Sequence, residues 1–234
     1  MRRHRVDLYD GEIAYLDTLV AETVAWARAR GPSGRSPLFV IAADHGEVLD
    51  ELFDRSGRAF FHSKVLAPGS LAIPLIVNWE GSVDPGQVLA GPAGLTDVAP
   101  TIFELLGREG FETQGASLFA QGRGGGGDGS DLVFSEREVF SLARQWEYRA
   151  TEQFAVSDGR YQLVVTDPFS RTALYDLERD PGGLNDLSEK MPELAERLLA
   201  ELRSWLERVP EPGVVGADVP AEKIDALRAL GYIE

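Results

Sequence analysis

The sequence of 234 residues contains no cysteine, three histidines and no run of about 18 apolar residues. The absence of cysteine excludes disulfides, a thiolate nucleophile and metal sites with cysteine ligands. Without a long apolar run we expect no membrane span. We also expect no signal peptide, because the charged residues 1–10 are not followed by an apolar segment.

Positive charge is also scarce. Lysine and arginine number 23 against 38 acidic residues, which gives a formal net charge of -15. Such a chain repels a phosphate backbone and an anionic membrane surface, so we expect neither as a partner. Hydrophobic residues make up 44% of the chain, enough for a packed core in one or two domains.

The first part of the chain, residues 1–120, has the pattern of an α/β domain. Apolar residues recur at three- and four-residue steps over 10–30, which predicts an amphipathic helix. The run 37–43 is continuously apolar and 73–79 is apolar except for Asn78, which is typical of parallel strands covered on both faces. A further helix is predicted over 96–106, capped by Thr96 or Asp97. Together these segments predict a mostly parallel sheet with flanking helices.

A second region follows a glycine-rich segment. Six of the eleven residues in 121–131 are glycine, which predicts a linker. Residues 132–234 then predict a small subdomain that combines an antiparallel sheet with helices. Its predicted strands are 138–143, 153–156, 160–166 and 172–177. Leucines form one stripe over 192–207, which predicts a helix lying across that sheet, and a short helix is predicted at 221–230.

The residues best placed for chemistry follow the first predicted strand. Asp44 offers an oxygen ligand and His45 an imidazole nitrogen, and Gly46 allows the backbone to turn away after them. In open α/β sheets ligands bind beyond the carboxyl ends of strands, so this pair is a candidate metal site. The alternative is a helix cap beside a surface histidine.

His62 is the second candidate, and it lies 17 positions after His45. Its neighbours include Phe60, Phe61 and Lys64, so a packed histidine beside a solvated lysine is the alternative interpretation. The chain has only three histidines, and this favours the hypothesis that His45 and His62 meet at one site.

Several segments, in this order along the chain, resemble the sulfatase family of the alkaline-phosphatase-like superfamily. His62 with Pro74 contributes to the resemblance. The other segments are LYDGEIAYLD (8–17), ADHGE (43–47), LTDVAPTIFELLG (95–107), ALYDLERDP (173–181), NDL (185–187) and LRALGY (227–232). The resemblance implies the corresponding α/β sandwich for residues 1–120 and a small C-terminal subdomain for 132–234.

The resemblance also implies hydrolysis of sulfate esters, or of phosphate or phosphonate esters, at a divalent metal. Calcium is the common metal in the family, and manganese or zinc are possible here. Asp44 and His45 match the second of two pairs of metal ligands. His62 matches a histidine that contacts the substrate, where it could donate to the sulfate oxygens or protonate the leaving oxygen, and Lys64 could add a positive charge.

One departure from the family concerns the nucleophile. Sulfatases use a formylglycine made within a Cys/Ser-x-Pro-x-Arg motif, beside the first pair of metal ligands in the N-terminal half. This chain has no cysteine, and its nearest look-alike, residues 166–171, has one residue too many before the arginine. The chain therefore resembles only the C-terminal half of a sulfatase. We expect weak metal binding, no catalysis by the chain alone, and a possible requirement for an N-terminal half as partner.

Three interpretations stay open. The first is a sulfatase-type hydrolase of which this chain is a part. The second is a phosphohydrolase or phosphotransferase of the same superfamily, with a threonine or serine nucleophile and manganese or zinc. The third is a non-catalytic remnant that serves as an interaction module. Neither the substrate nor the compartment can be predicted from these residues.

Overall fold

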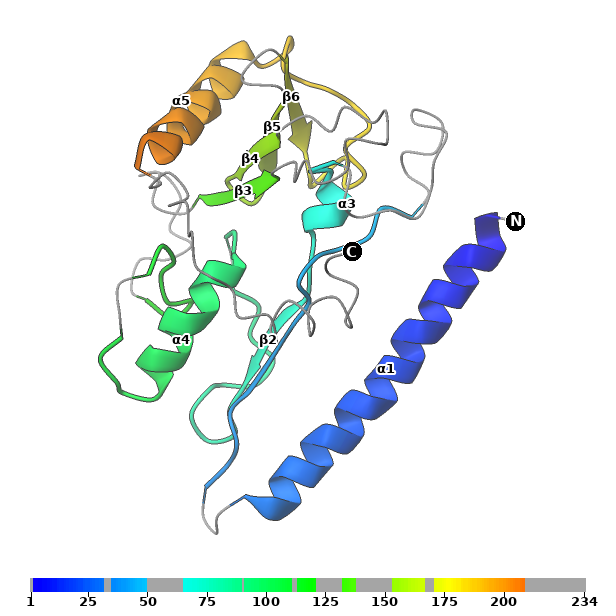
Figure 1. Ribbon diagram of the computed structural model, residues 1–234, viewed down its shortest axis with the longest axis vertical. Helices are drawn as coiled ribbons and strands as arrows, with labels where there is room; N and C mark the ends of the chain where they lie inside the picture. The colour runs from blue at the N-terminus through cyan, green and yellow to red at the C-terminus, as the bar shows by residue number, and fades with distance from the viewer. Residues whose placement is uncertain are drawn as a thin grey trace, which may run out of the picture. The chain divides into compact units, whose positions relative to one another are not determined.

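A computed structural model describes residues 2–31, 35–49, 65–89, 91–110, 113–120, 132–137, 153–166 and 171–208 (Figure 1). The chain forms two compact units, Met1–Leu202 and Arg203–Glu234. In the second unit, the described residues are the C-terminal end of helix α5. The predicted linker 121–131 and the predicted helix 221–230 lie outside the described residues, so the proposed domain boundary stays a prediction.

Helix α1 spans Arg2–Arg30, so it begins earlier than the predicted start at residue 10. Its basic last turn complements the partial negative charge of a helix C-terminus, and the Arg28 guanidinium lies 5.9 Å from the centre of the Phe39 ring. Several of its large apolar side chains are exposed, among them Leu16 and Trp26. Within the described part of the chain, no helix has both the length and the hydropathy that a membrane span needs.

Strands β1 (Phe39–Ala42) and β2 (Leu75–Asn78) form a two-stranded sheet, in which Val40 lies opposite Val77. The pairing is antiparallel, whereas the sequence predicts parallel strands. The prediction fails on direction because a continuous apolar run indicates burial and carries no information on the orientation of a neighbour. Burial is also incomplete in the described structure, since Ile76 is half exposed.

Short helices connect this sheet to the rest of the first unit. Helix α3 spans Pro68–Leu71, and the predicted helix over 96–106 is a 3-10 turn η1 (Leu95–Asp97) followed by α4 (Val98–Leu105). Asp97, one of the two predicted caps, is the residue before α4 and is 5% exposed. Its carboxylate accepts hydrogen bonds from the backbone N–H groups of Gly94 and Ala116, at 2.8 and 2.9 Å. These bonds connect the start of the helix to Gly94, just before η1, and to Ala116 in the segment that follows α4.

A four-stranded antiparallel sheet forms the second part of this unit, in the order β3-β4-β5-β6 (Figure 1). Its strands are β3 (Val133–Arg137), β4 (Gln153–Ser157), β5 (Tyr161–Thr166) and β6 (Arg171–Asp176). The antiparallel sheet is confirmed, and three of its predicted strands match β4, β5 and β6. Strand β3 was not predicted, and the predicted strand 138–143 lies outside the described residues.

This sheet carries buried side chains on both faces. One face holds Val156, Leu163, Val165 and Leu174, all 0% exposed. The other face holds Ala155 and Val164, which form an apolar cluster with Leu66. Helix α5 (Pro192–Arg208) matches the predicted helix over 192–207, and Leu198 and Leu202 of its leucine stripe are also 0% exposed.

An ion pair at the end of this sheet predicts how stability changes with pH. Asp176 is 5% exposed, and its Oδ2 accepts a hydrogen bond from Arg160 Nη2 at 3.1 Å. This bond holds the pKa of Asp176 below its ordinary value, and backbone N–H groups of Arg179 and Glu178 act in the same direction. The carboxylate therefore stabilises the fold above its unfolded pKa of about 3.9, and this stabilisation is lost as pH falls through the lower folded pKa.

We expect Asp176→Asn to lower stability at pH 7 and to flatten the acid limb of the stability curve. The measurement is the urea midpoint between pH 7 and pH 2 for both proteins. Glu178→Gln is the matched control, because the Glu178 side chain is 69% exposed although it also contacts Arg160. The prediction would be contradicted if the urea midpoints of the Asp176→Asn variant and the parent fell equally between pH 7 and pH 2.

Candidate metal site

The candidate metal ligands Asp44 and His45 follow β1 directly, and both are exposed in the described structure. The Asp44 side chain is 88% exposed and the His45 side chain 47% exposed. The backbone N–H of His45 donates to Asp44 Oδ1 at 2.9 Å, which fixes the direction of the carboxylate. The same oxygen lies 3.7 Å from His45 Nε2. The structure thus brings the two predicted ligands together as a pair.

The tautomer of His45 follows from its neighbour. Nδ1 lies 2.9 Å from the carbonyl oxygen of Gly46, and a carbonyl can only accept, so Nδ1 carries the proton. In the neutral ring, Nε2 then holds the lone pair that a metal needs. Backbone carbonyls commonly orient metal-binding histidines in this way. The ring is therefore set to offer Nε2 on the side where Asp44 Oδ1 lies.

The donor atoms fit a shared divalent cation in part. Metal–ligand bonds of about 2.0 to 2.6 Å let two ligands lie 3.7 Å apart around one ion. The carboxylate suits calcium or manganese, whereas the imidazole suits zinc and other transition metals. The described residues contain no group of three or more histidine, aspartate or glutamate side chains that could hold a metal. The pair is thus a partial cage.

Gly46 packs this loop against α3. Its N–H donates to the carbonyl oxygen of Ser70 at 2.9 Å. A Cβ atom at this position would collide with the carbonyl oxygen of Gly69 and would lie 2.6 Å from that of Ala72. Both obstacles are backbone atoms that cannot rotate away. The close approach, rather than a positive φ, is what requires glycine directly after His45.

The other predicted site residues, His62 and Lys64, lie outside the described residues, and their roles stay predictions. The segment that follows them is described from Val65 onward. There the backbone of Leu66 is bonded on both sides by buried glutamines, Gln153 and Gln162. Sequence reasoning did not identify these glutamines, because a polar residue in a strand predicts a solvent-facing position.

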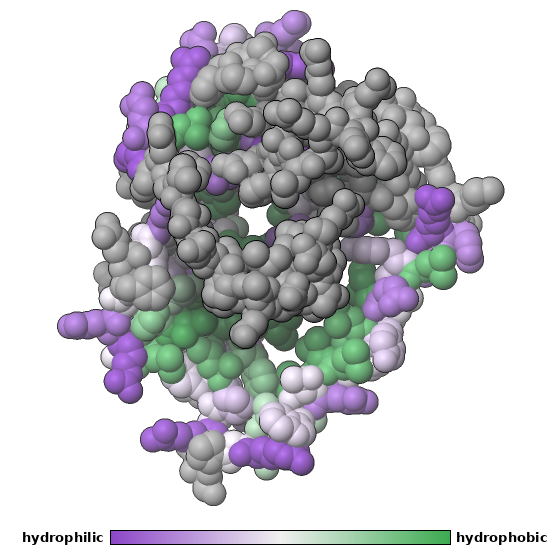
Figure 2. All heavy atoms as spheres, viewed as in Figure 1, coloured by the Kyte–Doolittle hydropathy of each residue, from purple (hydrophilic) through white to green (hydrophobic). Residues whose placement is uncertain are grey.

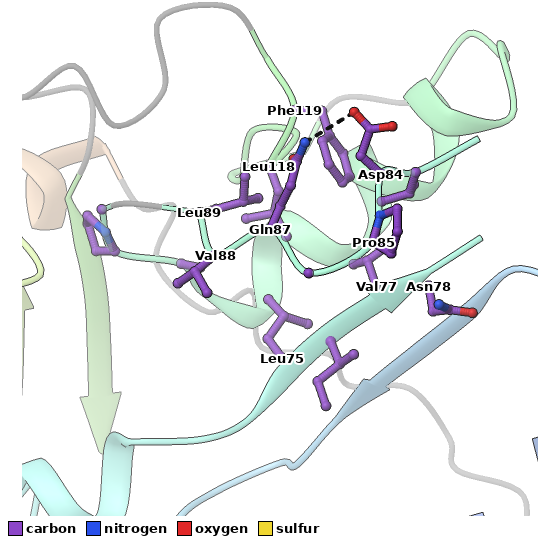
Figure 3. Close-up of a pocket in the computed structure, with 16 residues that line it drawn as sticks. Leu75, Val77, Asn78, Asp84, Pro85, Gln87, Val88, Leu89, Leu118 and Phe119 are labelled. Atoms are coloured by element: carbon purple, nitrogen blue, oxygen red, sulfur yellow. Dashed lines mark hydrogen bonds between the residues drawn. The ribbon is translucent and has the colours of Figure 1, made fainter. Parts of the chain in front are cut away.

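An apolar cavity of about 500 Å³ lies beside β2 (Figure 3). Its walls include Leu75, Val77, Leu118 and Phe119, and neither Asp44 nor His45 lines it. Figure 2 shows apolar residues gathered in patches between hydrophilic ones on one face of the molecule. Among the described residues that line the cavity, none has a cationic side chain that could bind a sulfate group. The cavity is therefore distinct from the candidate metal site.

Comparisons with known proteins match the first part of the chain. The sulfatase family model matches residues 2–108. A segment of 84 residues is 37% identical to the low-salt glycan biosynthesis sulfotransferase of Haloferax volcanii, covering 36% of this chain and 20% of that protein. A segment of 82 residues is 33% identical to the steryl-sulfatase of Mus musculus, covering 32% of this chain and 13% of that protein. The matches thus span less than two thirds of these relatives.

Solved structures show the same likeness at the level of the fold. A protein in complex with its substrate D-glucosamine-2-N,6-O-disulfate has a TM-score of 0.64 at 15% identity, with 83% of this chain and 39% of that chain covered. The phosphonate monoester hydrolase of Silicibacter pomeroyi has a TM-score of 0.57 at 24% identity, with 82% and 38% covered. At these identities the likeness shows the fold alone.

The fold indicates the class of protein. It is a mixed α/β structure with antiparallel sheets, and its neighbours include sulfatases and phosphonate monoester hydrolases. Within that class, the sulfatase family model matches residues 2–108, so this part of the chain is similar to part of a sulfatase domain.

Proposed function

We propose that this chain is the part of a sulfatase-type hydrolase that supplies one pair of metal ligands, Asp44 and His45. The observation that carries the proposal is the geometry of the pair. Asp44 Oδ1 lies 3.7 Å from His45 Nε2, and the Gly46 carbonyl orients the His45 ring through Nδ1. The sulfatase family match over residues 2–108 includes both ligands.

Each site residue has a proposed role. Asp44 and His45 hold a divalent cation, with calcium as the first candidate and manganese or zinc as alternatives. When bound, the cation supplies charge neutralisation for the oxygens of the ester group. His62 donates a hydrogen bond to these oxygens or protonates the leaving oxygen, and Lys64 adds a positive charge beside them.

The nucleophile of this reaction comes, in this proposal, from another segment. The sequence has no cysteine, and residues 166–171 do not fit the nucleophile motif. Two ligands also leave most of the coordination sphere of calcium to other groups. We therefore propose that a complementing N-terminal half of the domain provides the nucleophile and the remaining ligands. The substrate is then a sulfate ester.

The test is hydrolysis by the protein as its own cells make it. The protein that contains this sequence is purified and assayed on 4-nitrophenyl sulfate with EDTA, and again after calcium or manganese is returned. We expect EDTA to abolish hydrolysis and the cation to restore it, and we expect the 234-residue chain alone to show no turnover. Hydrolysis that is insensitive to EDTA, or full turnover by the chain alone, would contradict the proposal.

A second candidate is hydrolysis of phosphonate or phosphate esters. The observation that favours it is the imidazole of His45, since an imidazole nitrogen suits zinc better than calcium, which takes oxygen ligands. The fold likeness to a phosphonate monoester hydrolase is compatible with it. The ratio of kcat/KM for phenyl phosphonate to that for 4-nitrophenyl sulfate separates the two. A ratio above one would favour the second candidate.

A further inference from the structure

We propose that Gln153 and Gln162 form a clamp that positions the Asp44–His45 pair from the four-stranded sheet. The clamp acts through Leu66 and helix α3, and the inference rests on the proposed function of the pair as metal ligands. Gln153 and Gln162 are positioning residues in this proposal, because neither touches the ligands directly. The connection consists of three steps, all among described residues.

The first step joins the sheet to Leu66. Gln153 Oε1 accepts a hydrogen bond from the Leu66 N–H at 2.8 Å, and Gln162 Nε2 donates one to the Leu66 carbonyl at 3.2 Å. Gln153 lies on β4 and Gln162 on the neighbouring β5, and they are 8% and 3% exposed. Both polar groups of one buried peptide residue are thus satisfied by side chains 87 and 96 positions away.

The orientation of both amides follows from the backbone of Leu66. An N–H requires an acceptor and a carbonyl requires a donor, so Gln153 presents its oxygen and Gln162 its nitrogen. Gln153 Nε2 lies 3.4 Å from Thr166 Oγ1, which gives the other end of that amide a partner. Loss of either bond would leave a buried backbone group unsatisfied, which costs more than the bond itself contributes. The clamp therefore fixes Leu66 in one place.

The second step runs from Leu66 into α3. Ser70 is 4% exposed, and its hydroxyl lies 2.8 Å from the carbonyl oxygens of Val65 and Ala67, which flank Leu66. The backbone N–H of Ser70 also donates to the Ala67 carbonyl at 3.0 Å. The Leu66 side chain packs against the sheet in the cluster that contains Leu71. Residues 65–71 thus form one braced turn attached to the sheet.

The third step joins α3 to the metal ligands. The Ser70 carbonyl accepts the N–H of Gly46, and the Gly46 carbonyl lies 2.9 Å from His45 Nδ1. The residue whose carbonyl faces the imidazole is therefore attached to α3 through its own N–H. A Cβ at Gly46 would collide with the Gly69 carbonyl oxygen, so the Gly46 backbone lies against α3, and in this proposal a shift of α3 moves Gly46. We infer that a change at the clamp reaches the orientation of His45.

The experiment uses the full 234-residue chain, labelled with ¹⁵N. Two quantities are measured: the amide exchange rates of Leu66 and Gly46, and the broadening of the signals of residues 44–46 during titration with Mn²⁺. For Gln162→Leu we expect exchange at Leu66 and Gly46 to become about five- to tenfold faster. We expect the apparent affinity for Mn²⁺ to fall about tenfold, the range seen for residues that orient metal ligands.

Two glutamate variants provide the sharpest comparison. Gln153→Glu keeps an acceptor for the Leu66 N–H, so Gly46 exchange and Mn²⁺ affinity are expected to stay near those of the parent. Gln162→Glu turns an acceptor toward the Leu66 carbonyl and is expected to behave like Gln162→Leu. Val165→Ala is the control for general destabilisation, because Val165 is 0% exposed and lies on the other face of β5.

The outcomes separate the clamp from the proposed function. Faster exchange at Leu66 with unchanged Gly46 exchange and unchanged Mn²⁺ affinity would overturn the clamp as a positioning device and leave the metal site intact. An equal loss of Mn²⁺ affinity in Val165→Ala would also overturn it. Mn²⁺ broadening that survives Asp44→Ala would instead overturn the proposed metal site, whatever the exchange rates show.

Discussion

Replacing Asp44 with alanine is expected to lower kcat/KM for 4-nitrophenyl sulfate by about a thousandfold in the complete hydrolase. A metal ion contributes several kcal/mol to stabilising charge in the transition state, and about 4 kcal/mol corresponds to this factor. Without Asp44, the described part of the site keeps only the imidazole of His45 as a ligand of the pair. The measurement is steady-state kinetics across a range of calcium concentrations.

The exposure of Asp44 makes this prediction easy to separate from unfolding. Its side chain is 88% exposed, so the substitution should leave the melting temperature unchanged. Asp84→Asn, at another exposed carboxylate, is the matched control and should leave both activity and stability unchanged. His45→Asn, which supplies an amide oxygen in place of the imidazole nitrogen, should retain more activity than His45→Ala. Near-parental activity of Asp44→Ala at every calcium concentration would contradict the assignment.

Gly46→Ala is the second substitution with a large expected effect. The added Cβ would lie 2.6 Å from the Ala72 carbonyl oxygen and closer still to that of Gly69. Because both are backbone atoms, the loop must move away from α3 and lengthen the bond to the Ser70 carbonyl. We expect a loss of about 1 to 3 kcal/mol in the free energy of unfolding, measured by urea denaturation. Mn²⁺ binding at residues 44–46 should weaken together with it.

A second glycine provides the matched control. Gly11 lies inside α1, and a Cβ added there would meet nothing within 4 Å. Gly11→Ala should therefore stabilise the protein by about 0.5 to 1 kcal/mol, because alanine favours the helix. Equal and small effects of the two substitutions would show that the contact between Gly46 and α3 does not form in solution.

Local patterns predicted α5 and three strands of the C-terminal sheet. The leucine stripe over 192–207 matches α5, and three short strand-like segments match β4, β5 and β6. Strand β3 carries the residues VFSER, whose short and partly charged pattern does not distinguish a strand from a loop. The predicted parallel direction of β1 and β2 was also wrong. The direction depends on which strand becomes the neighbour, and the residues of one strand do not determine it.

The candidate site was only partly accessible from the sequence. Asp44 and His45 are adjacent in the sequence, so their proximity could be predicted without tertiary information. The apolar strand before them also predicts that they lie at the carboxyl end of a strand. The tautomer of His45 depends on the Gly46 carbonyl, and the need for glycine at position 46 depends on contacts with α3, so both emerge only in the structure. Gln153 and Gln162 give no local signal, because their partner is a backbone group far away in the sequence.

The most direct test of the metal site is an anomalous difference map from crystals of the chain soaked in Mn²⁺. We expect a peak within about 2.0 to 2.6 Å of both Asp44 Oδ1 and His45 Nε2, with the His45 Nδ1 still facing the Gly46 carbonyl. Peaks at other carboxylates, together with no peak between Asp44 and His45, would contradict the assignment of this pair as metal ligands.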